Sequence, residues 1–144
     1  MIRALLAAVL MLTPFAAAQA QPGVNATAPA PQGSAQRRAI LNALRPAVER
    51  RLGPNVEFVV SSIRIRPGWA VVMADPQRRG GGRIDGRRYF PASDWEFMDG
   101  ITVTAVLRFA SARWSLVNHA IGATDVWYCD GETMPPGIAR AFGC

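Results

Sequence analysis

The spacing of apolar residues after Ser34 predicts a helix that continues through Arg51. Its buried face has the three-to-four spacing of an amphipathic helix and comprises Ile40, Leu41, Leu44, Val48 and Leu52. Ser34 is a suitable N-cap, and Gly53-Pro54 predicts the end of the helix. Pro46 lies inside the pattern, so we expect either a kink there or a second short helix that starts at this proline.

Period-two alternation then predicts two hairpins. The first starts at Val56, turns at Pro67-Gly68 in a type II turn and returns to Ala74, with a phase change at Ser61-Ser62 that indicates a β-bulge. The second pairs residues 101–109 with residues 114–120. We therefore expect an α+β fold: one N-terminal helix packed on one face of a four-stranded antiparallel sheet.

The hairpins are separated by a long connection, Asp75–Gly100, which is rich in glycine and proline. Connections of this length are uncommon in compact domains unless they are functional or partly disordered. Asp85-Gly86 favours a small hairpin inside it. Near the end of the chain, residues 137–142 are expected to form one helical turn.

The first 20 residues have the pattern of an export signal. Arg3 precedes a nine-residue apolar run, and Ala18-Gln19-Ala20 matches a signal-peptidase site, with cleavage expected after Ala20. Nine residues span about 14 Å as a helix, too short for a membrane core of about 30 Å. We expect a flexible leader over residues 21–35, a single domain over residues 36–144, and a periplasmic or secreted protein without a transmembrane segment after signal removal.

Composition narrows the chemistry. The 144 residues carry a formal net charge of +6, and every basic residue other than the one histidine is arginine. In an oxidising compartment Cys129 and Cys144 favour a structural disulfide over a redox pair. With both cysteines so used, a Cys/His metal cluster is excluded, and we predict no metal and no cofactor.

The densest charge lies between the hairpins. Residues 78–88 contain five arginines on the two sides of Gly80-Gly81-Gly82 and a single acid, Asp85. The arginines are Arg78, Arg79, Arg83, Arg87 and Arg88. Guanidinium forks and glycine backbone suit anionic partners such as an envelope component or an acidic protein. A solvated loop that serves only solubility is the alternative, and nucleic acid is disfavoured by the compartment.

Two weaker patterns remain. Asp94, Glu96 and Asp99 lie beside aromatic residues, as the carboxylates of a glycoside hydrolase do. His119 precedes Asp125 and follows Ser115, but strand parity puts Ser115 and His119 on one side about 13 Å apart, beyond hydrogen-bond reach.

Three segments carry a resemblance to a known family: Gly68–Val72, Trp114–Val117 and Ile121–Val126. Through them the chain resembles small exported bacterial proteins of unassigned function over roughly residues 38–140. The resemblance implies an exported helix-plus-sheet domain and no activity. The helix followed by a four-stranded meander is also similar to the cystatin-like architecture, although the Gln-x-Val-x-Gly signature of cystatins is absent. Our leading hypothesis is a non-catalytic binding or accessory module that uses the Arg-rich loop. The alternatives are a small envelope glycan hydrolase and an inhibitor of a secreted enzyme.

Overall fold

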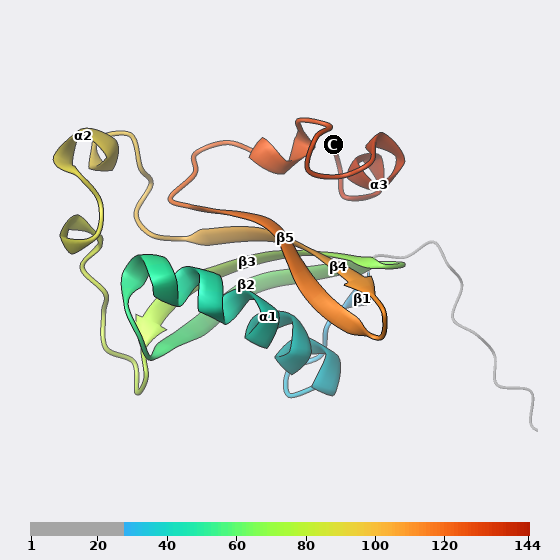
Figure 1. The fold of residues 1–144 in the computed structure, drawn as a ribbon, viewed down its shortest axis with the longest axis horizontal. Coiled ribbons are helices and arrows are strands. Elements are labelled where there is room, and N and C mark those ends of the chain that lie inside the picture. The colour runs from blue at the N-terminus through green and yellow to red at the C-terminus, as the bar shows by residue number, and fades with distance from the viewer. Residues whose placement is uncertain (1–27) are drawn as a thin grey trace, which may run out of the picture.

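The computed structural model describes residues 28–144, so the expected signal peptide and the leader before Ala28 lie outside the described residues. Within this range one antiparallel sheet has the strand order β1-β2-β3-β4-β5 (Figure 1). Its strands are β1 (Ala28–Pro29), β2 (Val56–Arg66), β3 (Trp69–Arg78), β4 (Val103–Ala110) and β5 (Arg113–Ile121). The expected α+β class is confirmed: one long helix packs against the four-stranded meander β2–β5.

The two-residue strand β1 lies at the edge of the sheet, within the range expected to be a leader. Ala28 pairs with Ile65, and Pro29 pairs with Arg64. The next residue, Ala30, is buried in the main core. Residues 28–30 are therefore part of the folded domain, because a small apolar side chain finds space beside β2 even in a segment rich in proline and glycine.

The helix α1 spans Ala35–Leu52. The Oγ atom of Ser34 accepts a hydrogen bond of 3.1 Å from the backbone N–H of Arg37, which confirms the expected N-cap. Gly53 ends the helix with φ of +79°, a conformation that favours glycine. The helix continues through Pro46, so the two-helix alternative is wrong. This proline is exposed, so its ring displaces no core side chain.

A β-bulge in β2 determines which side chains face α1. The pairing of β2 with β3 shifts register between Val60 and Ser62, as the phase change predicts. Phe58 and Val60 before the bulge, and Ile63 and Ile65 after it, all join the core on the α1 side. The bulge thus brings even-numbered and odd-numbered apolar residues to one face of the sheet.

The opposite face of the sheet is covered as well, although the pattern of apolar residues does not predict this layer. Val71 of β3 and Val106 of β4 pack with Tyr128, Met134 and Phe142 in a second core cluster. Figure 1 shows the C-terminal segment on the side of the sheet that α1 does not occupy. The domain therefore has three layers: α1, the sheet and residues 127–144.

Two arginines of β2 attach this C-terminal layer. Arg64 donates hydrogen bonds to the carbonyl oxygen of Phe142, at 2.6 Å, and to the hydroxyl of Tyr128, at 3.1 Å. Arg66 donates through Nε to the carbonyl of Ala141 at 2.8 Å. These carbonyls lie at the end of α3 (Pro136–Ala141), where unpaired acceptors and the helix dipole favour cations.

Cys129 and Cys144 close this segment with a disulfide, their Cα atoms 5.5 Å apart, which confirms the expected pairing. Inside the loop, α3 forms at the expected helical turn. The backbone N–H groups of Thr133 and Glu132 donate to the Asp130 carboxylate and hold the pKa of Asp130 below its ordinary value. Among residues 28–144 no helix has the length and apolar character needed to cross a membrane.

Replacing both cysteines, Cys129→Ser and Cys144→Ser, should lower the free energy of unfolding by about 3 kcal/mol, because the unfolded chain regains the entropy of an open 15-residue loop. Urea denaturation followed by circular dichroism measures this loss. A reducing agent should shift the midpoint of the wild type and leave that of the double variant unchanged. Equal midpoints for the two oxidised proteins would contradict the prediction.

Candidate anion-binding surface

The segment between β3 and β4 forms short helices rather than an open loop. β3 extends to Arg78, beyond the expected Ala74, and is followed by the short helices η1 (Gly86–Arg88) and α2 (Ala92–Trp95). The small hairpin expected at Asp85-Gly86 is wrong. The carboxylate of Asp85 instead accepts a hydrogen bond of 3.2 Å from the backbone N–H of Arg87 and caps η1.

Gly86 explains why this helical turn lies against α2. A Cβ atom added at Gly86 would lie 2.3 Å from the ring of Trp95 and 2.5 Å from the side chain of Ile101, far inside van der Waals contact. Only glycine permits the approach. Gly86 thereby allows Arg87 of η1 to lie next to the Trp95 ring.

Arg78 is the arginine most engaged within the protein. Its guanidinium donates to the carbonyl oxygens of Leu52 (2.5 Å), Gly53 (3.2 Å) and Pro54 (2.7 Å), which follow one another at the end of α1. It also donates to the hydroxyl of Tyr89 at 2.7 Å. This side chain caps the C-terminus of α1 and joins it to the Arg-rich segment, so its donors are directed inward.

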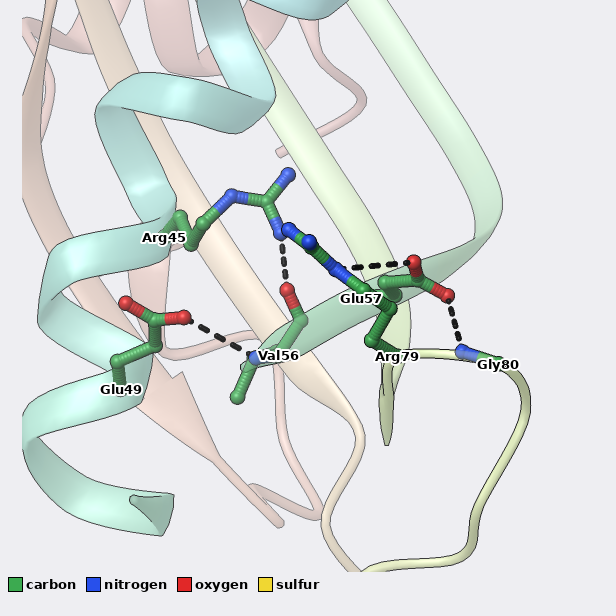
Figure 2. A network of polar contacts seen from close by, with 6 residues as sticks. All are labelled: Arg45, Glu49, Val56, Glu57, Arg79 and Gly80. Atoms are coloured by element: carbon green, nitrogen blue, oxygen red, sulfur yellow. Dashed lines mark hydrogen bonds and ion pairs between the residues drawn. The ribbon is translucent and has the colours of Figure 1, made fainter. Parts of the chain in front are cut away.

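Glu57 of β2 holds the start of the Arg-rich segment, at Arg79 and Gly80 directly after β3. One carboxylate oxygen lies 3.9 Å from Nε of Arg79, and the other accepts a hydrogen bond of 3.2 Å from the backbone N–H of Gly80 (Figure 2). Figure 2 also shows how α1 holds the adjacent residue of β2: Arg45 donates to the carbonyl of Val56, and Glu49 accepts from its N–H at 3.0 Å. The segment thus starts from a fixed point beside α1.

The other three arginines are exposed, and two of them share a hollow. Arg88 lies 4.0 Å from Asp85. Arg83 and Arg87 line a hollow of about 430 Å³ together with Trp95 and the acid Asp85, and the guanidinium of Arg87 lies over the Trp95 ring, 6.0 Å from its centroid. Within residues 28–144, neither Arg83 nor Arg87 has a carboxylate within 4.0 Å. The sequence pattern does not identify Trp95 as a site residue, because its contact with Arg87 depends on how α2 packs against η1.

The structure places the three carboxylates of the hydrolase alternative differently. Asp94 and Glu96 are exposed, and Asp94 accepts from the hydroxyl of Ser93 at 3.2 Å. Asp99 instead lines a hollow of about 510 Å³ that also contains Asp75 and Asp125. Asp75 is already engaged, since it accepts from the hydroxyl of Thr102 at 2.6 Å. Among the described residues, no three His, Cys, Asp or Glu side chains are grouped to hold a metal ion.

His119 lies on the opposite face from Ser115, contrary to the strand-parity prediction. Val106 pairs with Asn118 and Leu107 pairs with Leu116, so Val117 is left as a bulge in β5. His119 consequently pairs with Ala105 on the α1 side, whereas Ser115 pairs with Arg108 and is exposed. Burial first, and then the positive charge of Arg50, lower the pKa of His119 below 6.5.

Comparisons with family models, with curated proteins and with solved structures find no match for this chain. The interpretation of the site therefore depends on the chain's own geometry: an inward-facing Arg78, two arginines beside carboxylates, and a hollow with Arg83, Arg87 and an aromatic ring.

Arg78→Gln should lower the free energy of unfolding by about 2 kcal/mol, because three carbonyls at the end of α1 lose a charged donor. Urea denaturation measures the change. Arg83→Gln is the matched control, with an expected change within about 0.5 kcal/mol, as for an exposed side chain. Equal effects of the two substitutions would refute the structural role of Arg78.

His119 predicts a pH dependence of stability. Because its pKa is lower in the folded protein than its ordinary value of 6.5, the unfolded chain binds this proton more tightly. The free energy of unfolding should therefore fall as the pH drops through 6.5, before carboxylates titrate. His119→Gln should remove this loss, and Arg50→Gln should reduce it by relieving the repulsion. Urea midpoints measured between about pH 7.5 and 5.5 provide the test; identical profiles for wild type and His119→Gln would contradict it.

Proposed function

We propose that this protein is a non-catalytic binding module of the bacterial envelope that contacts an anionic partner through Arg83 and Arg87. The observation that carries the proposal is their shared hollow: both arginines line it beside Trp95, and although Asp85 also lines it, within residues 28–144 no carboxylate lies within 4.0 Å of either guanidinium. An unpaired cation beside an aromatic ring is suited to receive an anion from outside the protein.

The neighbouring arginines extend the positive surface. Arg79 and Arg88 have side chains that are 80% and 79% exposed, and each pairs with a carboxylate only at 3.9–4.0 Å. Exposed pairs of this kind contribute about 0–1 kcal/mol, so a strong external anion can compete for both arginines. Arg78 takes no part in this contact because its donors are used at the end of α1.

The compartment expected for this protein supports an envelope component as its partner. The first 20 residues have the pattern of an export signal, and the one disulfide of the chain is of the kind that persists in an oxidising compartment. Outside the cytoplasm of a bacterium, anionic lipid head groups are an abundant source of negative charge, and arginine forks match phosphate geometry. We take this phosphate-bearing surface as the partner to be tested.

Sedimentation with vesicles provides the test. Wild-type protein should sediment with phosphatidylcholine vesicles that contain phosphatidylglycerol, and added salt should release it. Arg83→Gln with Arg87→Gln should weaken the binding roughly thirtyfold, since each arginine near an anionic surface contributes about 1 kcal/mol. Circular dichroism should show an unchanged melting curve.

Arg113→Gln with Arg140→Gln is the matched control, because it removes the same charge from exposed positions elsewhere. This control should retain most of the binding. Equal losses in the two double variants would mean that net charge alone drives the association and would refute the assigned surface. Wild-type protein that fails to sediment at low salt would refute the lipid partner.

A further inference from the structure

A second hollow, of about 410 Å³, lies between the C-terminal half of α1 and the end of β5. Its lining combines three apolar residues with three basic ones: Ala47, Phe90, Ile121, Arg50, Arg51 and His119. The volume falls in the range of small-molecule sites, and the mixture of apolar wall and convergent polar groups is their usual composition. The hollow shares no lining residue with the one around Arg83 and Arg87.

The basic side chains of this hollow have no acid to neutralise them. No carboxylate lines it, and within residues 28–144 neither Arg50 nor Arg51 forms an ion pair within 4.0 Å. The nearby acid in the sequence, Glu49, is instead committed to the backbone N–H of Val56. A lining with two guanidinium groups and no compensating charge favours an anion.

Arg51 is also held in place. Its guanidinium lies 4.4 Å from the centroid of the Phe90 ring. Stacking covers one face of the planar guanidinium and leaves the N–H groups at its edges free to donate. The same ring provides apolar surface next to the cation, so a ligand that reaches the guanidinium also meets Phe90 and Ile121.

His119 completes the polar part of the wall. It lines the hollow together with Arg50 and Arg51 of α1, and burial, followed by the charge of Arg50, lowers the pKa of His119 and so favours the neutral imidazole. A neutral imidazole both donates and accepts hydrogen bonds. Repulsion between a protonated His119 and Arg50 is the interaction that a bound anion would relieve.

We propose that this hollow binds a small organic acid, whose carboxylate pairs with Arg50 and Arg51 while its apolar body covers Phe90 and Ile121. The site is separate from the surface in the proposed function and does not depend on it. Octanoate is a suitable probe, because it combines one carboxylate with an apolar chain. Its dissociation constant should be on the order of millimolar, as expected for so small a ligand.

His119 is the one histidine of the chain, so its NMR signals report on this hollow without ambiguity. Octanoate, kept below its micelle concentration, should shift these signals saturably and raise the pKa of His119, because the carboxylate stabilises the imidazolium. Octanol, which lacks the charge, should not raise this pKa. Acetate, which lacks the apolar body, should not saturate in the same concentration range.

Variants separate this site from the rest of the surface. Arg50→Gln with Arg51→Gln should weaken octanoate binding roughly tenfold or more, whereas Arg37→Gln with Arg38→Gln removes the same charge from the first turn of α1 and should leave it unchanged. Arg83→Gln with Arg87→Gln should also retain it. Circular dichroism checks that each variant is folded.

Three results would overturn the proposal. They are the absence of a saturable shift in the wild type, unchanged affinity in the Arg50/Arg51 variant, and an equal loss in the Arg37/Arg38 variant. If the Arg50/Arg51 variant does not fold, the comparison of octanoate, octanol and acetate on the wild type decides, and an equal response to octanoate and octanol refutes the carboxylate.

Discussion

The packing of α1 on one face of the sheet requires that each strand keep apolar side chains on that face along its length, even where β3 and β4 also place Val71 and Val106 on the other face. Two β-bulges meet this requirement. In β2 the register shift between Val60 and Ser62 brings Ile63 to the face that Phe58 already occupies. In β5 the bulge at Val117 brings His119 and Ile121 to the face of Leu116. Without the second bulge, the hollow beside α1 would have neither residue in its wall.

The arginines of this chain divide by their partners rather than by their position in the sequence. Arg78 caps the end of α1, and Arg64 attaches the C-terminal layer, so both act within the fold. Arg83, only five residues after Arg78, is exposed and has no carboxylate partner within residues 28–144. A guanidinium can donate hydrogen bonds to several carbonyl oxygens at once. In this protein, which has no lysine, arginine therefore provides hydrogen bonds within the fold as well as charge at the surface.

Local signals in the sequence predict much of this fold. Ser34 and Gly53 mark the ends of α1 because capping depends on the residues themselves. The bulge in β2 can be predicted from the sequence, because apolar residues recur at even-numbered positions before Ser61-Ser62 and at odd-numbered positions after it. In β5 the bulge residue Val117 and the core residue Leu116 before it are both apolar, so the alternation does not show where the phase changes. The hairpin expected at Asp85-Gly86 is wrong because the contact of Gly86 with Trp95 decides the local conformation.

The candidate sites depend on contacts that are distant in sequence, and this is why the charge pattern located them only in part. The density of arginines points to residues 78–88, yet it does not distinguish the inward-facing Arg78 from Arg87 beside Trp95. Arg50 and Arg51 look like the solvated end of a helix, where cations are favoured by the dipole alone. They become part of a site because the guanidinium of Arg51 lies over the Phe90 ring and β5 places His119 near Arg50. In both hollows a neighbouring element supplies an apolar wall beside the cations. No acid lines the hollow of Arg50 and Arg51, whereas Asp85 lines that of Arg83 and Arg87 and forms its ion pair with Arg88.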